Sequence, residues 1–203
     1  MVLIVNQSNL DLESKALREM FEARKRVFVD LLKWDLPVLA GRFEVDHFDD
    51  GAATYIIVTD PAGRHLASAR LLQTTSPALL DSLYPDLVAG PVPRGADILE
   101  ITRFCLSPGI GARLRRTARD TLLVGLVEYA LAHDIKSYTG VAEQNWFEQI
   151  CTFGWDCRPL GSSRVHAGRL LSSLRIEIDD TTIGRLAARG IGPASHVPAA
   201  QAA

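Results

Sequence analysis

The chain has 203 residues, a length typical of one globular domain or two small ones. With 47% hydrophobic and 23% charged residues it has enough apolar material for a substantial core, which excludes a mainly disordered chain. Lys and Arg number 22 against 24 Asp and Glu, a formal net charge of −2, so the bulk charge indicates neither a nucleic-acid nor a membrane partner.

The termini and the cysteines indicate the compartment. The apolar runs are too short to cross a bilayer, and residues 1–6 lack the basic start of a secretion signal. Cys105, Cys151 and Cys157 are an odd number without CxxC spacing, so we expect neither a structural disulfide nor a cysteine zinc site. The five histidines lack metal-ligand spacing, and no metal is expected. A reduced, cytoplasmic protein is therefore predicted.

The first half of the chain combines strand-length apolar runs with one helical segment. Apolar residues spaced three or four apart predict a helix, which Pro37 breaks because the residue before a proline avoids the α region. Pro61 and Gly63 supply turn chemistry for a hairpin. The expected elements are a strand at 1–5, a helix at 11–32, strands at 53–60 and 65–73, and a long, partly ordered loop at 74–97.

The second half alternates strands with helices. The expected elements are a strand at 98–105, a helix at 112–133, a strand at 136–143, a short helix at 145–153, one or two strands within 158–178, and a frayed tail from 190 with little to bury. This order predicts an α+β fold with three α/β/α layers around a mixed central sheet. We expect a single domain over residues 1–189, with 190–203 as a flexible tail.

One group of candidate functional residues lies near the N-terminus. Arg24 and Phe28 are four apart, so they share a helix face, and Trp34 lies beyond the helix end. Asp46 and Asp49 follow in an acidic loop. Taken singly, each has an ordinary structural explanation: a surface arginine, two core aromatics and two solvated acids. Their combination and spacing favour a functional site.

A second group lies on the strand predicted at 98–105. Glu100 and Arg103 are charged residues within an apolar strand, where burial is costly unless the charges are paired or used. They could simply neutralise each other. In a regular strand Glu100 and Arg103 face opposite sides, so the strand must bulge or splay if both are to serve one site.

The ordered set of motifs resembles the acyl-homoserine-lactone synthases, the LuxI-type autoinducer synthases. That family has an Arg, a Phe and a Trp, then E-x-D-x-x-D, an Arg on a strand, an aromatic residue in the next loop, and E-x-T-R-F. GVAEQNWFEQI and FGWDCRPLG extend the similarity to about residue 161. Tyr84 departs mildly from the pattern, because the family more often has Phe there. The matching positions are Arg24, Phe28, Trp34, Glu44 to Asp49, Arg70, Tyr84 and Glu100 to Phe104.

The resemblance implies a fold similar to that of the CoA-dependent N-acetyltransferases and a two-step reaction that makes a quorum-sensing signal. The α-amine of S-adenosylmethionine attacks an acyl thioester, and the carboxylate of the product then displaces 5′-methylthioadenosine and closes a lactone. The co-substrates are S-adenosylmethionine and either acyl-CoA or an acyl carrier protein thioester, with no permanently bound cofactor. Small molecules are thus the expected partners, with an acyl carrier protein as an alternative.

The resemblance also suggests roles for the candidate residues. Glu100 is the candidate base, because the amine must lose a proton and burial in an apolar sheet raises the pKa of a carboxyl group. Guanidinium groups can fork onto the substrate carboxylate, and an aromatic face with nearby acids suits the sulfonium. Spacing does not decide how these roles divide. The candidates are Glu100 and Arg103 for catalysis, and Arg24, Phe28, Trp34, Asp46, Asp49, Arg70, Tyr84, Phe104 and Thr139 for substrate binding.

A glycine-rich turn opens the helix predicted at 112–133. Exposed amides at a helix start suit phosphate, so Gly109, Gly111, Arg113 and Arg116 are candidate contacts for the acyl donor; a solvated basic helix end is the alternative. An acidic carrier protein needs a basic surface, yet the segment 139–150 carries two glutamates and no Lys or Arg. Acyl-CoA is therefore favoured as donor.

Two other functions compete with this interpretation. One is a plain N-acyltransferase that uses acyl-CoA and another amine without forming a lactone. The other is a non-catalytic sensor of acyl thioesters that keeps the fold. The block from Arg24 to Asp49 favours the synthase, because a plain acyltransferase does not need it.

Overall fold

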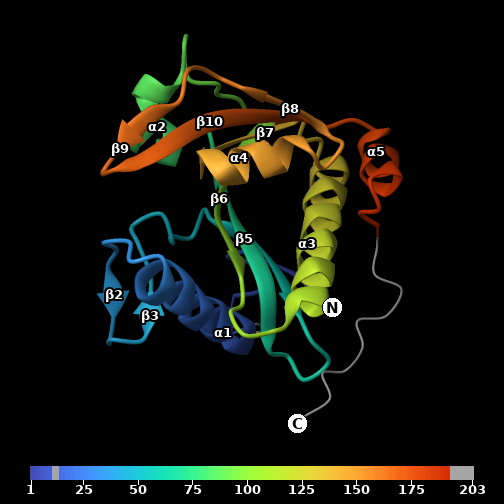
Figure 1. Cartoon of the computed structure of the whole chain (residues 1–203). Helices are drawn as coiled ribbons and strands as arrows, with labels where there is room; N and C mark the ends of the chain where they lie inside the picture. The colour runs from blue at the N-terminus through green and yellow to red at the C-terminus, as the bar shows by residue number, and fades with distance from the viewer. Residues whose placement is uncertain (11–13, 193–203) are drawn as a thin grey trace. The chain divides into compact units, whose positions relative to one another are not determined.

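The computed structural model in Figure 1 describes residues 1–10 and 14–192. These residues form two compact units. Unit 1 comprises residues 1–70 and 103–125, and unit 2 comprises 71–102 and 126–192. Within the described ranges, every helix is too short or too polar to cross a membrane.

Unit 1 contains four neighbouring strands in the order β1-β4-β5-β6, with β5 and β6 continuing into unit 2. A two-stranded hairpin of β2 and β3 accompanies them. The elements are β1 (Val2–Val5), α1 (Ser14–Arg24), the π-helical segment Lys25–Leu31, β2 (Val38–Leu39), β3 (Phe43–Glu44), β4 (Thr54–Thr59), β5 (His65–Gln73), the end of β6 (Ile98–Leu106) and the first two-thirds of α3 (Ala112–Ala132).

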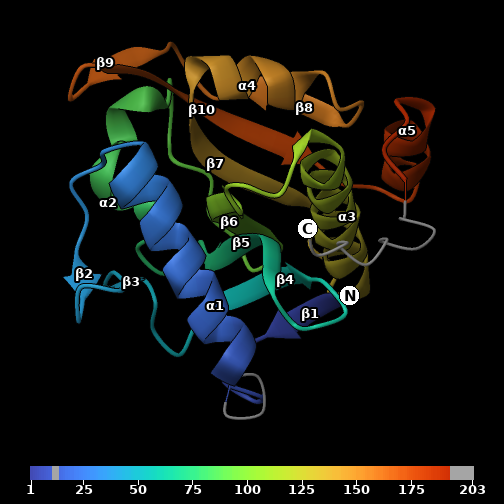
Figure 2. The same ribbon diagram turned by 60° about the horizontal axis from the view of Figure 1, so that its bottom comes forward.

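A helix covers each face of the β1–β4 pair in unit 1, as the alternation of side chains along a strand allows. On one face, the ring of Tyr55 meets Phe21 of α1 edge-on at 6.0 Å, and Figure 2 shows α1 crossing these strands. On the other face, a Cβ at Gly125 of α3 would lie 3.3 Å from Val2 and 3.5 Å from Ile56. Unit 1 is therefore built as helix, sheet and helix.

Unit 2 contains a mixed sheet. Its strand order is β6-β7-β10-β8, with β9 paired to β10; β6 and β7 are parallel and the β10 pairings are antiparallel. The Tyr138 hydroxyl donates to the Leu126 carbonyl at 2.8 Å and so ties β7 to the end of α3. The elements are α2 (Leu79–Leu83), a 3₁₀ turn (Pro85–Leu87), β7 (Ser137–Glu143), α4 (Gln144–Cys151), β8 (Asp156–Pro159), β9 (Arg164–His166), β10 (Arg169–Glu177) and α5 (Thr182–Ala188).

Strand β6 contains the irregularity expected from the sequence. Arg103 has a φ of +49°, in the left-handed region that residues with a Cβ rarely adopt. The parallel register of β6 and β7 pairs Ile98 with Ser137 and continues to the pair Ile101 and Gly140. The strand is therefore regular up to the glutamate of its motif and distorted at the arginine.

The structure confirms the strands predicted at 1–5, 53–60, 65–73, 98–105 and 136–143, and the helices predicted at 112–133 and 145–153. The mixed sheet and its α+β class agree with the expected fold. Boundaries differ by one or two residues, as is usual at the ends of elements.

Other expectations were wrong in part. The helix predicted at 11–32 is α-helical only as far as Arg24 and then π-helical, and residues 11–13 lie outside the described range. The loop at 74–97 contains α2 and a 3₁₀ turn, because Leu80 and Leu87 are fully buried and anchor it. Three strands, rather than one or two, begin within 156–177, and α5 follows them. In the expected tail, Ile191 is buried, whereas 193–203 lie outside the description.

A close backbone approach in unit 2 gives a test of this fold. A Cβ at Gly161 would lie 2.5 Å from the Leu87 carbonyl oxygen and 2.8 Å from the Ala89 nitrogen. We expect Gly161→Ala to lower the free energy of unfolding by about 1–3 kcal/mol, measured by urea denaturation, because backbone must shift to admit the methyl group. Gly184→Ala is the control, since its Cβ meets nothing within 4 Å in α5. Equal stability of the two variants would contradict this packing.

Candidate active site

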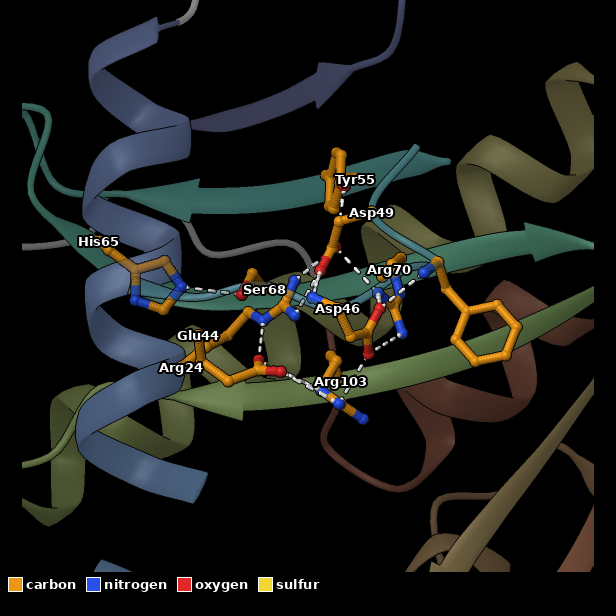
Figure 3. Close-up of polar contacts among 10 residues, drawn as sticks. Arg24, Glu44, Asp46, Asp49, Tyr55, His65, Ser68, Arg70 and Arg103 are labelled. Atoms are coloured by element: carbon orange, nitrogen blue, oxygen red, sulfur yellow. Dashed lines mark hydrogen bonds and ion pairs between the residues drawn. The ribbon is translucent and has the colours of Figure 1, made fainter. Parts of the chain in front are cut away.

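Six charged side chains gather in unit 1 (Figure 3). They come from the last residue of α1, from β3, from the loop after β3, and from β5 and β6. We call them the charge ring. Its members are Arg24, Glu44, Asp46, Asp49, Arg70 and Arg103.

Arg24 contacts two carboxylates with a side chain that is almost completely buried. Its Nη1 and Nη2 each donate to one oxygen of Asp49 at 2.8 Å, and its Nε donates to Glu44 Oε2 at 2.6 Å. Burial alone would lower the pKa of Arg24, but the hydrogen bonds and charges of the two carboxylates outweigh it and raise that pKa. The guanidinium is therefore charged at every physiological pH.

Arg70 and Arg103 complete the arrangement. Arg70 Nη1 lies 2.5 Å from Asp46 Oδ1 and 2.9 Å from Asp49 Oδ1. Arg103 Nη2 lies 3.0 Å from Glu44 Oε1 and 2.7 Å from Asp46 Oδ2. Each of the three guanidinium groups thus contacts two carboxylates, and each carboxylate contacts two guanidinium groups. The six side chains form a closed ring of alternating charge with a formal sum of zero.

The D-x-x-D spacing shapes the loop that supplies two acids of the ring. Asp49 Oδ2 accepts the Asp46 N–H at 2.9 Å, and Asp46 Oδ1 accepts the Phe48 N–H at 2.9 Å, a local pattern typical of aspartate in turns. Although burial raises the pKa of a carboxyl group, Arg70 lowers the pKa of Asp46 and Arg24 lowers that of Asp49. Both acids are therefore ionised.

The two predicted aromatic residues lie beside the ring. Phe28 and Trp34 stack at 4.9 Å with an interplanar angle of 26°. Phe28 is buried in a small core with Cys105. The backbone N–H of Trp34 donates to the backbone carbonyl of Phe28 at 2.8 Å. The guanidinium carbon of Arg103 lies 5.7 Å from the Phe28 ring centre, within cation–π range. Phe28 is thus a core residue and a neighbour of the ring at once.

The members of the ring differ in exposure. The side chains of Asp46 and Arg103 are each 8% exposed, against 0–1% for the other four. These two residues form the accessible rim. The rim thus consists of one carboxylate and one guanidinium.

Glu100 lies in unit 2 and is 1% exposed. Both of its carboxylate oxygens accept the Leu80 N–H, at 2.9 and 3.1 Å, in the first turn of α2. A backbone amide at this position stabilises the ionised form of a carboxylate. Thr139 on β7 is the register partner of Glu100 on β6. The structure thus holds the Glu100 carboxylate in a fixed position beside Thr139, the residue predicted to contact the acyl group.

The remaining predicted residues are not members of the charge ring. Tyr84 is in unit 2, where its ring meets His166 edge-on at 5.2 Å. Phe104 follows Arg103 and is half-buried. Gly109 and Gly111 have φ values of +78° and +62° before α3, and Arg113 and Arg116 are exposed in its first turns.

Two partners of the predicted site residues, Glu44 and Tyr55, were not among the candidates predicted from the sequence. Glu44 bridges Arg24 and Arg103, and its place in the E-x-D-x-x-D motif was the signal that could have singled it out. Tyr55 donates to Asp49 Oδ1 at 2.9 Å, and burial followed by the charge of Asp49 raises the pKa of its hydroxyl. Nothing in the local sequence of β4 distinguishes Tyr55 from an ordinary core residue.

A buried histidine of unit 1 pairs with Ser68 (Figure 3). His65 Nδ1 is 2.7 Å from Ser107 Oγ and Nε2 is 2.9 Å from Ser68 Oγ. Ser107 Oγ donates to the His65 carbonyl, so it accepts from Nδ1–H, and Nε2 accepts from Ser68. Burial lowers the pKa of His65 to about 3, and the folded protein holds a neutral imidazole.

The chain is similar to known proteins over most of its length. A family profile described as "Autoinducer synthase" matches residues 7–186. An acyl-homoserine-lactone synthase of Rhizobium etli is 32% identical over 177 residues, which cover 86% of this chain and 83% of the relative.

The similar solved structures include acyl-homoserine lactone synthases. A CoA-dependent acyl-homoserine lactone synthase, MesI, has 28% identity and a TM-score of 0.83, over 96% of this chain and 97% of that one. Another, BjaI with SAM and isopentyl-CoA, has 25% identity and a TM-score of 0.85, over 96% and 90% of the two chains. An acyl-CoA N-acyltransferase from Pseudomonas aeruginosa, 16% identical with a TM-score of 0.57 over 86% and 98%, shares the fold, as expected from the sequence.

The neutral state of His65 leads to a pH-dependent stability. The unfolded chain binds a proton at this residue below a pKa of about 6.5, whereas the folded chain does so only near 3. Stability from this residue is therefore complete above pH 6.5 and decreases as the pH falls toward 3. We expect the free energy of unfolding to decline between about pH 6.5 and 4.5, and His65→Gln to show a flatter profile. Parallel profiles for the two proteins would contradict a buried neutral His65.

Proposed function

Because this chain belongs to the autoinducer synthase family, we propose that it joins the acyl group of a coenzyme A thioester to S-adenosylmethionine and releases an acyl-homoserine lactone. The family match confirms the family and the acyltransferase class expected from the sequence. The charge ring carries the proposal. It is built by the motif residues that a plain N-acyltransferase does not need.

The proposed reaction has two steps. The α-amine of S-adenosylmethionine attacks the thioester carbonyl, the C–S bond breaks, and coenzyme A leaves as the thiol with the proton that the amine gives up. The α-carboxylate oxygen then attacks the γ-carbon, and the bond from this carbon to the sulfonium sulfur breaks. Neutral 5′-methylthioadenosine leaves and the lactone closes. Neither step needs a metal or a permanently bound cofactor.

We assign recognition of S-adenosylmethionine to the ring. The substrate presents an ammonium, a carboxylate and a sulfonium, and the rim of the ring offers one carboxylate, Asp46, and one guanidinium, Arg103. A substrate carboxylate can fork onto Arg103 while the ammonium meets Asp46, so every charge keeps a partner of opposite sign. The stacked pair Phe28 and Trp34 provides aromatic faces suited to the sulfonium.

We assign the first proton transfer to Glu100. Its carboxylate is buried and held by the Leu80 amide, and a carboxylate at this place can accept the proton that the amine gives up. Thr139, its register partner on β7, is the proposed contact for the acyl chain. Both residues lie in unit 2, and Arg103 follows Glu100 three residues later on the same strand.

We propose acyl-CoA rather than an acyl carrier protein as the donor. Arg113 and Arg116 are exposed in the first turns of α3, where backbone amides also suit phosphate. MesI and BjaI, the similar solved structures, are described as CoA-dependent. The segment 139–150 carries two glutamates and no basic residue, which disfavours an acidic protein partner.

We further propose a cytoplasmic location. Cys105, Cys151 and Cys157 are all free thiols in the structure, a state that a reducing compartment preserves. The proposed acyl-CoA donor is also an intracellular metabolite.

Release of 5′-methylthioadenosine tests the proposed function. Purified protein is incubated with S-adenosylmethionine, with and without acyl-CoA, and the nucleoside is quantified by chromatography. We expect release only when the thioester is present, together with one lactone per nucleoside. Consumption of acyl-CoA with amide formation but no nucleoside would favour the plain N-acyltransferase, and no turnover with either donor would favour a sensor.

Kinetics with one acyl group on both carriers test the donor. We expect a higher kcat/KM with the coenzyme A thioester, and a loss in the double variant Arg113→Ala/Arg116→Ala that the exposed control Arg18→Ala does not show. A higher kcat/KM with the carrier-protein thioester, falling steeply with added salt, would assign the basic start of α3 to protein docking instead.

Glu100→Gln separates catalysis from folding. The amide oxygen can still accept the Leu80 N–H, so we expect the fold and the affinity for S-adenosylmethionine to persist. Amide formation should fall by about 10²-fold or more, because glutamine cannot accept the proton. Glu128→Gln, at an exposed position of α3, is the matched control. Turnover of Glu100→Gln close to that of the control would remove Glu100 from the role of base.

A further inference from the structure

Two of the three cysteines meet in unit 2, outside every residue assigned to the reaction. Cys151 is the last residue of α4 and Cys157 lies in β8, six positions later. Their sulfur atoms are 3.7 Å apart. Cys151 is exposed and Cys157 is partly buried, so the pair lies at the surface of the unit.

The turn between α4 and β8 holds the two thiols in this position. Phe153 and Trp155 are buried with their rings 6.0 Å apart, and the Trp155 indole N–H donates to the Ile150 carbonyl at 2.9 Å. Gly154 has a φ of +101°, and a Cβ there would lie 2.6 Å from the Arg185 carbonyl oxygen. The turn is therefore anchored from both ends, and the proximity of the thiols is a property of the fold.

From this geometry we propose that Cys151 and Cys157 form a reversible intramolecular disulfide in the folded protein. A disulfide needs a separation of about 2.05 Å between the sulfur atoms, which rotation of the two side chains and a small backbone shift can supply from 3.7 Å. Two thiols fall short of the four ligands that structural zinc takes, and nowhere in residues 1–10 and 14–192 do three His, Cys, Asp or Glu gather to hold a metal.

The chemistry points to exchange with a small disulfide such as oxidised glutathione. Burial raises the pKa of Cys157, and Cys151 is the exposed residue of the pair, so Cys151 is the thiol that a small disulfide reaches first. The pair thus responds to the thiol–disulfide balance of the compartment, in the way cytosolic redox-sensing pairs do.

The exchange runs in two steps. The Cys151 thiolate attacks one sulfur of oxidised glutathione, the glutathione S–S bond breaks, and one glutathione thiolate leaves. The Cys157 thiolate then attacks Cys151 Sγ in the mixed disulfide and expels the second glutathione. The protein loses two electrons and two protons, and one oxidised glutathione becomes two reduced molecules.

Mass spectrometry of the full-length protein tests this proposal without reference to the enzymatic activity. Reduced protein is equilibrated with oxidised glutathione, denatured, alkylated and digested with trypsin. Peptide 137–164 contains both Cys151 and Cys157, because the bond after Arg158 precedes a proline, and peptide 104–113 contains Cys105. We expect peptide 137–164 to lose the mass of two hydrogens and escape alkylation, to regain both thiols with dithiothreitol, and to react faster from about pH 7 to about pH 9.

Two variants make the result decisive. Cys157→Ser should retain one glutathione on Cys151, because the resolving thiol is absent, whereas Cys105→Ala should behave as the wild type does. Cys105 is fully buried and burial raises the pKa of its thiol to about 12, so it should be alkylated only after denaturation. Wild-type protein that keeps both thiols alkylatable, or that retains glutathione on Cys151 as Cys157→Ser does, would overturn the proposal.

Discussion

The six buried charges of the charge ring in unit 1 depend on one another, because each has its two partners of opposite charge within the ring. Taking an ion out of water costs several kcal/mol, and removing one member of a buried pair costs about 3–5 kcal/mol because the other is left uncompensated. In the charge ring each member serves two neighbours, so Arg24 at the end of α1 fixes both Glu44 of β3 and Asp49 of the following loop. One set of ion pairs thereby positions segments that lie far apart in the chain.

The backbone accommodates the ring at two unusual places. Directly after Arg24 the helix widens into the π-helical segment Lys25–Leu31, a form frequent at functional sites. Arg103 adopts a left-handed conformation within β6, which costs about 1–3 kcal/mol and persists where surrounding interactions determine it. Its contacts with Glu44 and Asp46 provide such interactions. In the proposed function, this strain directs a guanidinium toward the substrate carboxylate.

The sequence predicted most of the strands, helices and charged site residues, but not the contacts that join the charged residues into a ring. Alternation and period located most strands and helices, and motif spacing identified five of the six ring residues as candidates. Glu44 was matched as the first residue of the E-x-D-x-x-D motif but was given no role, because the motif alone does not show that its carboxylate reaches both Arg24 and Arg103. The π-helical segment and α2 were not predicted. Phe28 is buried in the first and Leu80 in the second, and apolar spacing alone does not specify such tertiary burial.

Calorimetric titration of S-adenosylmethionine into Asp46→Asn tests most directly whether the charge ring is the substrate site. Asp46 belongs to the accessible rim, and the asparagine keeps its size while losing the charge. We expect at least about tenfold weaker binding, the effect of one lost charged hydrogen bond, and wild-type affinity for the control Asp50→Asn in the same loop. Wild-type affinity in Asp46→Asn would contradict recognition of the substrate by the ring.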